Sequence, residues 1–273
     1  MKNITLVLIA LVFILGSSFQ PKPAGPRYRV FTYNIRYANK ADGVNSWENR
    51  RALVAAQILL YYPQILGLQE VLSSQLADLK KAMPDYTFIG VGRDDGKEAG
   101  EFSPIAFDKA QARNLIDWKT IWLSPTPNKP SKGWDAALPR IATLARLKMI
   151  NGDTLTVINT HFDHQGEKAR LESAKLILSL LPAKNYIVMG DLNATSDEAP
   201  VLELLNSGKF ATPRPIPYAT CCGFKKRPDS EGKTIDYILY PSTATLFKQY
   251  ADSTTKNGYY GSDHLPVYSV IGF

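Results

Sequence analysis

Polar residues stand at or just past the ends of apolar segments at several points along this chain of 273 residues. Those that offer carboxylate, amide or imidazole groups are Asn34, Glu70, His161, Asp191, Asn193, Asp263 and His264. In open α/β folds, ligands bind beyond the carboxyl ends of the strands. We therefore expect these side chains, although distant in sequence, to meet in one cleft.

Glu70 ends the apolar string LGLQE, where an unpaired buried carboxylate is costly unless a cation or a hydrogen-bond donor compensates it. A divalent metal ion is one such partner. With Asp263 and the amide of Asn34, Glu70 could supply the oxygen ligands that magnesium or manganese prefers, leaving positions for water and a phosphate oxygen. Zinc fits less well, because the chain has two cysteines and three histidines.

The string YIVMGDLN delivers Asp191 and Asn193 after an apolar strand that ends in glycine. Alternation along an extended chain puts both side chains on one side, where one substrate group could meet a carboxylate and an amide together. The alternative is that the two residues only form a turn and cap the next helix.

Two of the three histidines, His161 and His264, lie near predicted strand ends beside acidic residues, which favours a chemical role. Asp236 interrupts the apolar string TIDYIL. Pairing with a histidine would explain a charge there, because a buried carboxylate orients the ring and favours its protonated form. Glu101 could do the same for the other histidine, whereas His164 lies past its strand end and is interpreted as peripheral.

The elements that position these residues follow from hydrophobic periodicity. Helical spacing of apolar residues predicts helices over 47–61, 73–83, 167–181 and 198–205. Alternating or continuous apolar segments predict strands over 27–34, 64–68, 86–91, 102–107, 112–118, 141–150, 153–160, 186–189, 234–240 and 266–273, with Asn151-Gly152 as a hairpin turn. This mixture indicates an α/β fold, a four-layered α/β/β/α sandwich of two packed mixed β-sheets flanked by helices.

The N-terminus has one lysine, an apolar run from Ile4 to Leu15 and then small residues, which predicts a signal peptide over 1–18. That run is well short of the roughly 20 residues that cross a bilayer. We expect one domain over 19–273, monomeric, without membrane insertion, and secreted or periplasmic. Cys221 and Cys222 are adjacent, and because neighbouring residues rarely reach disulfide geometry, we expect no intramolecular disulfide.

The chain resembles the endonuclease/exonuclease/phosphatase superfamily, in particular its secreted bacterial members and the deadenylase-like group. The matching strings are, in order, TYNIR, LGLQE, GEFSPIAF, WLSPTP, GWDAALPRIAT, NTHFDH, GDLNA, TIDYIL and GSDHLPV. Each string is weak alone, whereas the ordered series is specific and spans the predicted mature chain. The resemblance implies the same four-layered sandwich and a magnesium or manganese cofactor.

The resemblance also implies roles for the acidic residues of the site. Glu70 would bind the catalytic metal, with Asn34 and Asp263 near it. Asp191 would belong to the same metal site and orient or deprotonate the attacking water.

Around the phosphate, the resemblance implies contacts from Asn193, His161 and Arg140. Trp134, in the proline-rich loop 124–139, could stack on a base or sugar; a place in the core is the alternative for a tryptophan. We treat these four residues as the candidate substrate-binding set.

His264 resembles the histidine at the reaction centre of the family, and Asp236 the carboxylate that holds it. Glu101 similarly resembles the carboxylate paired with His161. Kept cationic by these carboxylates, both histidines would stabilise a pentacovalent phosphorus, as preorganised donors do.

These features predict a divalent-metal-dependent phosphoesterase that hydrolyses by in-line water attack, with a phosphodiesterase or nuclease as the leading candidate. In a nuclease, the basic stretch Lys225-Lys226-Arg227 would bind backbone phosphates, in a chain of net charge +7; the alternative is a solvated cluster of charges. The alternatives are a phosphatase of small sugar or inositol phosphates and a sphingomyelinase-like lipid phosphodiesterase. Outside the enzymes, the alternative is a non-catalytic module that binds a phosphate ligand.

Overall fold

The computed structural model describes residues 25–216, 219–221, 223–225 and 232–273. The helices are α1 (Trp47–Tyr61), α2 (Ser73–Ala82), α3 (Glu167–Leu180) and α4 (Ala199–Asn206), with the 3-10 helix η1 (Lys40–Asn45). The strands are β1 (Arg27–Asn34), β2 (Ile65–Gln69), β3 (Tyr86–Ile89), β4 (Ile105–Asp108), β5 (Ala112–Trp122), β6 (Ile141–Met149), β7 (Thr154–His161), β8 (Tyr186–Asp191), β9 (Asp236–Leu239), β10 (Thr245–Ala251) and β11 (Val267–Gly272).

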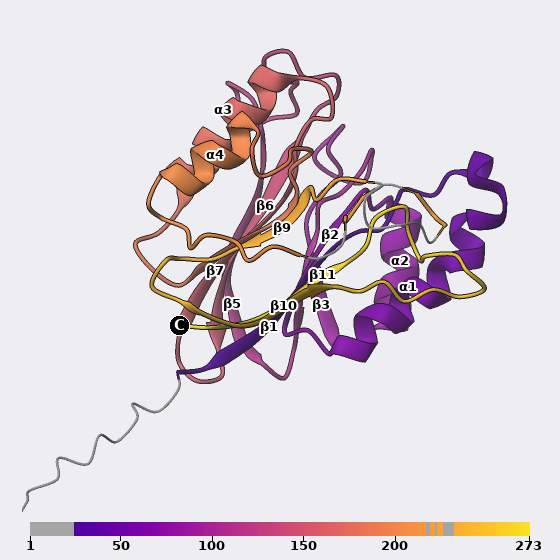
Figure 1. Ribbon diagram of the computed structural model, residues 1–273, viewed down its shortest axis with the longest axis horizontal. Coiled ribbons are helices and arrows are strands. Elements are labelled where there is room, and N and C mark those ends of the chain that lie inside the picture. Colours follow the sequence, from indigo (N-terminus) through magenta and orange to yellow (C-terminus); the bar gives the residue numbers. More distant parts are fainter. Residues whose placement is uncertain (1–24, 217–218, 222, 226–231) are drawn as a thin grey trace, which may run out of the picture.

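In the described residues, the strands form two sheets of mixed direction (Figure 1). One sheet has the order β10-β11-β1-β2-β4-β3 and the other the order β5-β6-β7-β8-β9. The pairs β1–β2 and β7–β8 are parallel. Because parallel strands end at the same edge of a sheet, each of these pairs delivers its last residues to one place.

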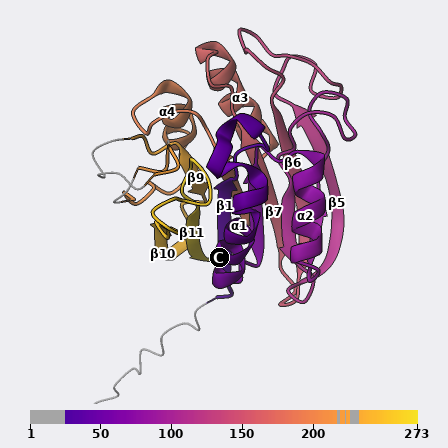
Figure 2. The same ribbon diagram turned by 90° about the vertical axis from the view of Figure 1, so that its right-hand side faces the viewer.

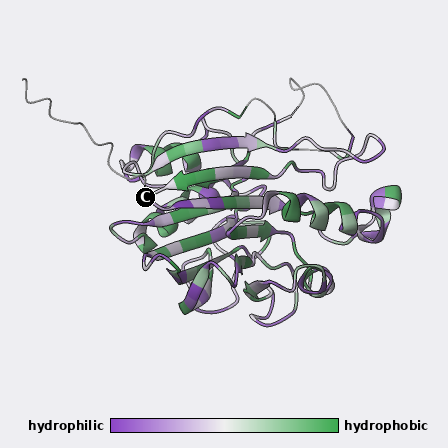
Figure 3. Ribbon diagram, turned by 90° about the horizontal axis from the view of Figure 1, so that it is seen from below, coloured by the Kyte–Doolittle hydropathy of each residue, from purple (hydrophilic) through white to green (hydrophobic). Residues whose placement is uncertain are grey.

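Four layers result, and they confirm the predicted α/β/β/α sandwich. Helices α1 and α2 lie on the outer side of one sheet, and α3 and α4 on the outer side of the other (Figures 1 and 2). Val30 packs in the core between the sheets, whereas its neighbour Phe31 packs with residues of α1. Since both faces of the central strands are buried, β2 and β8 are almost wholly apolar, and hydrophobic stretches recur along the strands (Figure 3).

The predicted helices are confirmed to within a residue or two at each end. The Asn151-Gly152 hairpin is also confirmed, because β6 and β7 pair antiparallel on either side of it and Gly152 has a φ of 92°. Strand β10 was not predicted. It lies at the edge of its sheet and exposes much of its length, so its sequence, TLFKQYA, carries no clear period.

The prediction of no disulfide is wrong for Cys221, which is disulfide-bonded in the structure. The other cysteine, Cys222, lies outside the described residues, as do Lys226, Arg227 and the predicted signal peptide over 1–18. None of the described helices is long and apolar enough to cross a membrane.

Gly190 lets β8 approach β7 immediately before Asp191. It has a φ of 142°, and a Cβ atom added there would collide with the carbonyl oxygen of Thr160 on β7. The glycine in YIVMGDLN therefore permits a close approach of the two strands, as the sequence suggests.

We expect Gly190→Ala to lower the free energy of unfolding by about 2–4 kcal/mol, because it adds a backbone clash to an unfavourable φ. Gly208→Ala is the matched control, since Gly208 also has a positive φ, 71°, but its added Cβ would meet nothing within 4 Å. The control should cost about 1 kcal/mol. Equal losses in urea-induced unfolding of the two variants would contradict the close approach at Gly190.

Candidate active site

Strands β7, β8 and β9 place three polar residues side by side. His161 is paired in register with Asp191, and Asp191 with Asp236. Residues directly opposite each other on neighbouring strands project from the same face of a sheet. All three residues are buried, so one edge of this sheet presents a compact group of an imidazole and two carboxylates.

The other sheet contributes from the ends of its parallel pair. Asn34 ends β1, and Glu70 follows β2 with a positive φ of 59°. The Asn34 amide nitrogen donates to Glu70 Oε1 at 2.9 Å and to Asp191 Oδ2 at 3.0 Å. One amide thus links the metal-binding candidate of one sheet to the central carboxylate of the other.

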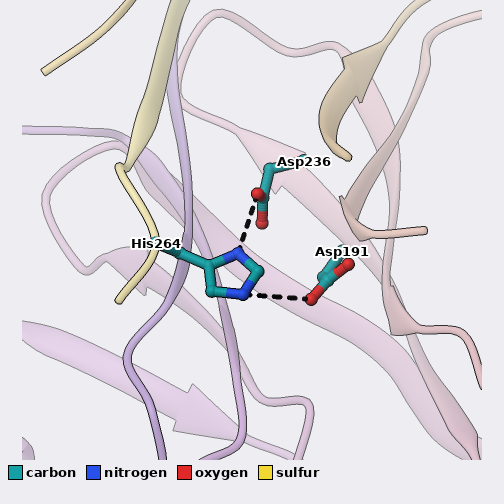
Figure 4. Close-up of side chains that lie close together, drawn as sticks. All are labelled: Asp191, Asp236 and His264. Atoms are coloured by element: carbon teal, nitrogen blue, oxygen red, sulfur yellow. Dashed lines mark hydrogen bonds and ion pairs between the residues drawn. The ribbon is translucent and has the colours of Figure 1, made fainter. Parts of the chain in front are cut away.

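His264 and Asp236 form the predicted pair. His264 Nδ1 lies 2.9 Å from Asp236 Oδ2, and His264 Nε2 lies 3.8 Å from Asp191 Oδ2 (Figure 4). Burial alone would lower the pKa of His264, but the charges of Asp236 and Asp191 outweigh it and raise the pKa to about 10. His264 is therefore a cation at neutral pH.

Asp191 is the carboxylate that the other groups surround. Burial, together with the charge of Asp236, raises the pKa of Asp191 to about 7, although His264 opposes this shift. The backbone N–H of Asn193 donates to Asp191 Oδ1 at 2.9 Å, which fixes the carboxylate orientation. Such a group can hold or release a proton near neutral pH.

The expectation that Glu101 keeps His161 cationic is not met in the structure. Glu101 Oε2 lies 4.0 Å from His161 Nδ1, but its short ion pair, at 2.7 Å, is with Arg93. Arg140 Nη1 donates to His161 Nδ1 at 3.0 Å. Burial and the positive charge of Arg140 hold the pKa of His161 well below its usual value, so this imidazole is neutral.

A cavity of about 610 Å³ lies at this site, although Asn34, Asp236 and Asp263 are not among its lining residues. Of the sequence-predicted site residues, it brings together Glu70, Glu101, Arg140, His161, Asp191, Asn193 and His264. The half-buried Trp134 is not among the lining residues, so the structure gives no support to its predicted role in substrate binding. His164, interpreted from sequence as peripheral, does line the cavity, and its Nδ1 accepts from Arg140 Nη2 at 3.1 Å.

A family model of the Endonuclease/Exonuclease/phosphatase family matches residues 31–264, which include every site residue described above. The chain belongs to this family. No curated protein matches the sequence.

Solved structures of the family share this fold along nearly their whole length. A Bacteroides thetaiotaomicron endonuclease/exonuclease/phosphatase family protein is 31% identical, with a TM-score of 0.85 over 91% of this chain and 98% of that chain. A mannosyl-6-phosphatase from the same organism is 32% identical, with a TM-score of 0.81 over 90% of this chain and 100% of that one. The human Nocturnin catalytic domain, 21% identical, has a TM-score of 0.68 over 90% of this chain and 93% of its own, which shows the fold alone.

For a member of this family, the residues around Glu70 fit a hard divalent cation. Glu70 and Asp263 repel each other, since burial and then the charge of Glu70 raise the pKa of Asp263, and Arg36 Nε approaches Asp263 Oδ2 only to 4.0 Å. The amide oxygen of Asn34 already accepts from the Arg36 N–H, so Asn34 chiefly holds its neighbours. Glu70 accepts from the Asn34 amide and from the Tyr37 N–H rather than from a cation, and carboxylate oxygens are the ligands that magnesium prefers.

The group formed by Asp191, Asp236 and His264 also resembles a metal site, but it is better explained without a metal. Ligand atoms of Asp191, Asp236 and His264 lie within 4.8 Å of one another (Figure 4). A histidine that is protonated on both nitrogens has no lone pair to offer a metal ion. Charge pairing accounts for this group.

Asp163 is a site-supporting residue that the sequence did not reveal. Its carboxylate accepts four backbone N–H groups, from Ala137, Leu138, Gln165 and Gly166, and lies 3.4 Å from Arg140 Nε. It therefore ties the proline-rich loop and Arg140 to the start of α3. The string HFDH shows an acidic residue there, but it gives no sign of the loop that supplies the donors.

We expect Asp163→Asn to lower the free energy of unfolding by about 2–4 kcal/mol at pH 7, because an NH2 group replaces the oxygen that accepts from the Leu138 N–H and Arg140 Nε, and the charge beside Arg140 is lost. Burial alone would raise the pKa of Asp163, but the four N–H groups hold it well below its usual range. The ionised group therefore stabilises the fold above its unfolded pKa of about 4, and this contribution is lost as pH falls toward the folded value.

The difference between wild type and Asp163→Asn should thus shrink between pH 7 and pH 3 in denaturant unfolding. Asp85→Asn, at an exposed aspartate between α2 and β3, is the control and should stay near wild type at every pH. A pH-independent difference would refute the role of the Asp163 charge.

Proposed function

We propose that this protein hydrolyses a phosphate ester with a divalent metal ion and that its substrate is a small phosphorylated sugar. The position of Asp191 Oδ2 carries the proposal. This one oxygen lies 3.0 Å from Asn34 Nδ2, 3.4 Å from His161 Nε2 and 3.8 Å from His264 Nε2, in the wall of the cavity. Asp191 is thus placed to meet a water molecule and a phosphate together.

Glu70 and Asp263 would hold the metal, magnesium or manganese, with Asp191 and Asn34 beside them. When bound, the ion supplies positive charge that neutralises phosphate oxygens and favours attack. Asp191 orients the attacking water and takes its proton, which its raised pKa permits.

The remaining groups stabilise charge on the phosphoryl oxygens. His264, cationic and held by Asp236, donates from Nε2 toward Asp191 and the cavity. The Asn193 amide reaches the same region, since its nitrogen lies 3.0 Å from His161 Nε2. Arg140 contributes charge from behind His161 rather than from an ion pair with Asp191.

Two observations support a small phosphomonoester over a nucleic acid. The mannosyl-6-phosphatase that resembles this chain is covered completely at 32% identity, whereas a zebrafish TDP2 structure with a single-strand DNA product is 18% identical. The cavity of about 610 Å³ is of the size that encloses a small ligand. The predicted nuclease activity remains the alternative that the following assay tests.

We expect magnesium-dependent release of phosphate from mannose 6-phosphate, loss of this activity in chelator, and much weaker cleavage of bis(p-nitrophenyl) phosphate or single-stranded DNA. Asp191→Asn should lower kcat by about a thousandfold, since general-base catalysis typically supplies 10²- to 10⁴-fold. Asp117→Asn, at an exposed residue of β5, is the control and should keep full activity. Cleavage of DNA but not of the sugar phosphate would favour the nuclease instead.

The pairing of His264 with Asp236 predicts a pH effect. If cationic His264 is required, activity should persist on the alkaline side up to pH values near its pKa of about 10. Asp236→Asn removes a charge that raises this pKa, so the alkaline limb of the kcat profile should move to lower pH and kcat should fall about a hundredfold or more. An unchanged alkaline limb would argue against a cationic His264 in the reaction.

A further inference from the structure

Arg170, in the first turn of α3, is a nearly buried cation that the mechanism above does not use. Its side chain lines the cavity, yet the residue is only 8% exposed. Its Nη1 donates to the backbone oxygen of Asp163 at 3.1 Å, whereas its buried Nε has no hydrogen-bond partner. Within the described part of the chain, no carboxylate lies within 4.0 Å of its guanidinium nitrogens.

A buried guanidinium without a counter-charge is unfavourable unless an anion completes it. The neighbouring groups do not supply one. Glu198 lines the same cavity, but its Oε2 accepts the N–H and the hydroxyl of Thr195 at 2.6 and 3.0 Å. The Asp163 carboxylate is taken up by Arg140 and four backbone N–H groups.

Among the described residues, Arg170 forms no hydrogen bond or ion pair with Asp191, His161 or His264; it is linked to them through other residues. Asp191 contacts Nε2 of His161, and Arg140 contacts the opposite ring nitrogen, Nδ1. Arg140 in turn contacts Asp163, to which Arg170 is bound. A chain of contacts through His161, Arg140 and Asp163 thus links Arg170 to Asp191. The exposed Lys233 adds a further positive charge to the cavity wall.

We propose that Arg170, assisted by Lys233, binds a second anionic group on the organic part of the substrate, a carboxylate or a phosphate. The proposal rests on the proposed function and narrows its substrate class to phosphorylated sugars or sugar acids that carry two anionic groups. Because Nε is closed off from the cavity, Arg170 would meet such a group with its terminal guanidinium nitrogens, the donors that also bind carboxylate and phosphate in other ion pairs.

The test compares glucose 6-phosphate, 6-phosphogluconate and fructose 1,6-bisphosphate as substrates of wild type, Arg170→Gln and Arg170→Lys with magnesium. For each compound, KM and kcat of the variants are compared with those of wild type, so that differences among the three sugars do not affect the comparison. Arg170→Gln should raise KM about 10- to 100-fold for the compounds with a second carboxylate or phosphate, with kcat unchanged. It should change KM for glucose 6-phosphate less than about twofold, and Arg170→Lys should restore part of the loss. The carboxylate and phosphate arms show which group the subsite prefers.

Two further measurements guard against misfolding. Lys233→Gln removes an exposed charge and should raise KM for the same two compounds about threefold, whereas Arg51→Gln on α1, also exposed, should have no effect. Thermal unfolding checks that Arg170→Gln is folded. If Arg170→Gln does not fold, Arg170→Lys decides, and equal KM values for that variant and wild type on the compounds with a second anionic group would overturn the proposal.

Failure of the inference and of the proposed function can be told apart. Equal losses on all three compounds would reduce Arg170 to a structural support of Asp163, although the phosphatase would stand. If wild type hydrolyses neither these compounds nor mannose 6-phosphate, the proposed function fails. The subsite is then judged by calorimetric binding of 6-phosphogluconate, which Arg170→Gln should weaken at least tenfold; unweakened binding would overturn it.

Discussion

The hydrogen bonds of the Asn34 amide join the two sheets where their strands end, and the site depends on this junction. Asn34 lies on β1, Asp191 on β8, and the amide nitrogen between Glu70 and Asp191 keeps two carboxylates apart while it contacts both. Without such a donor, these carboxylates would repel each other in a poorly solvated place. The neutral amide of Asn34 therefore does two things at once: it links the two sheets, and it separates the two carboxylates of the site.

The charged groups around the two histidines of the site give them different protonation states. His264 faces Asp236 and Asp191 and is cationic, whereas His161 faces Arg140 and is neutral. The sequence could not separate them, because each stands beside an acidic residue in a short motif. What decides is the charged group in closest contact with the ring: for His161 it is Arg140, since Glu101 is engaged by Arg93.

Much of the fold follows from the sequence because both faces of the central strands are buried, which makes their apolar segments long and distinct. That Asp236 pairs with a histidine is also visible, since a carboxylate inside an apolar strand requires a partner; the family resemblance indicates that this histidine is His264. In contrast, β10 is a half-exposed edge strand and leaves no period. The environments of Asp163 and Arg170 depend on a loop about 30 residues earlier in the chain that folds against α3, so their residue types alone indicate nothing.

That loop gives the site rigidity at a distance from the reaction. Asp135 accepts two N–H groups of the first turn of α3, at 2.7 and 3.2 Å, while Asp163 accepts N–H groups from the loop. The two aspartates thus exchange hydrogen bonds between loop and helix in opposite directions. Because Arg140 follows the loop and Arg170 belongs to the helix, this exchange fixes the separation of both guanidiniums before a substrate binds. Preorganised charges lose little entropy on binding, so a cavity with fixed cations can select its ligand by the spacing of the ligand's anionic groups.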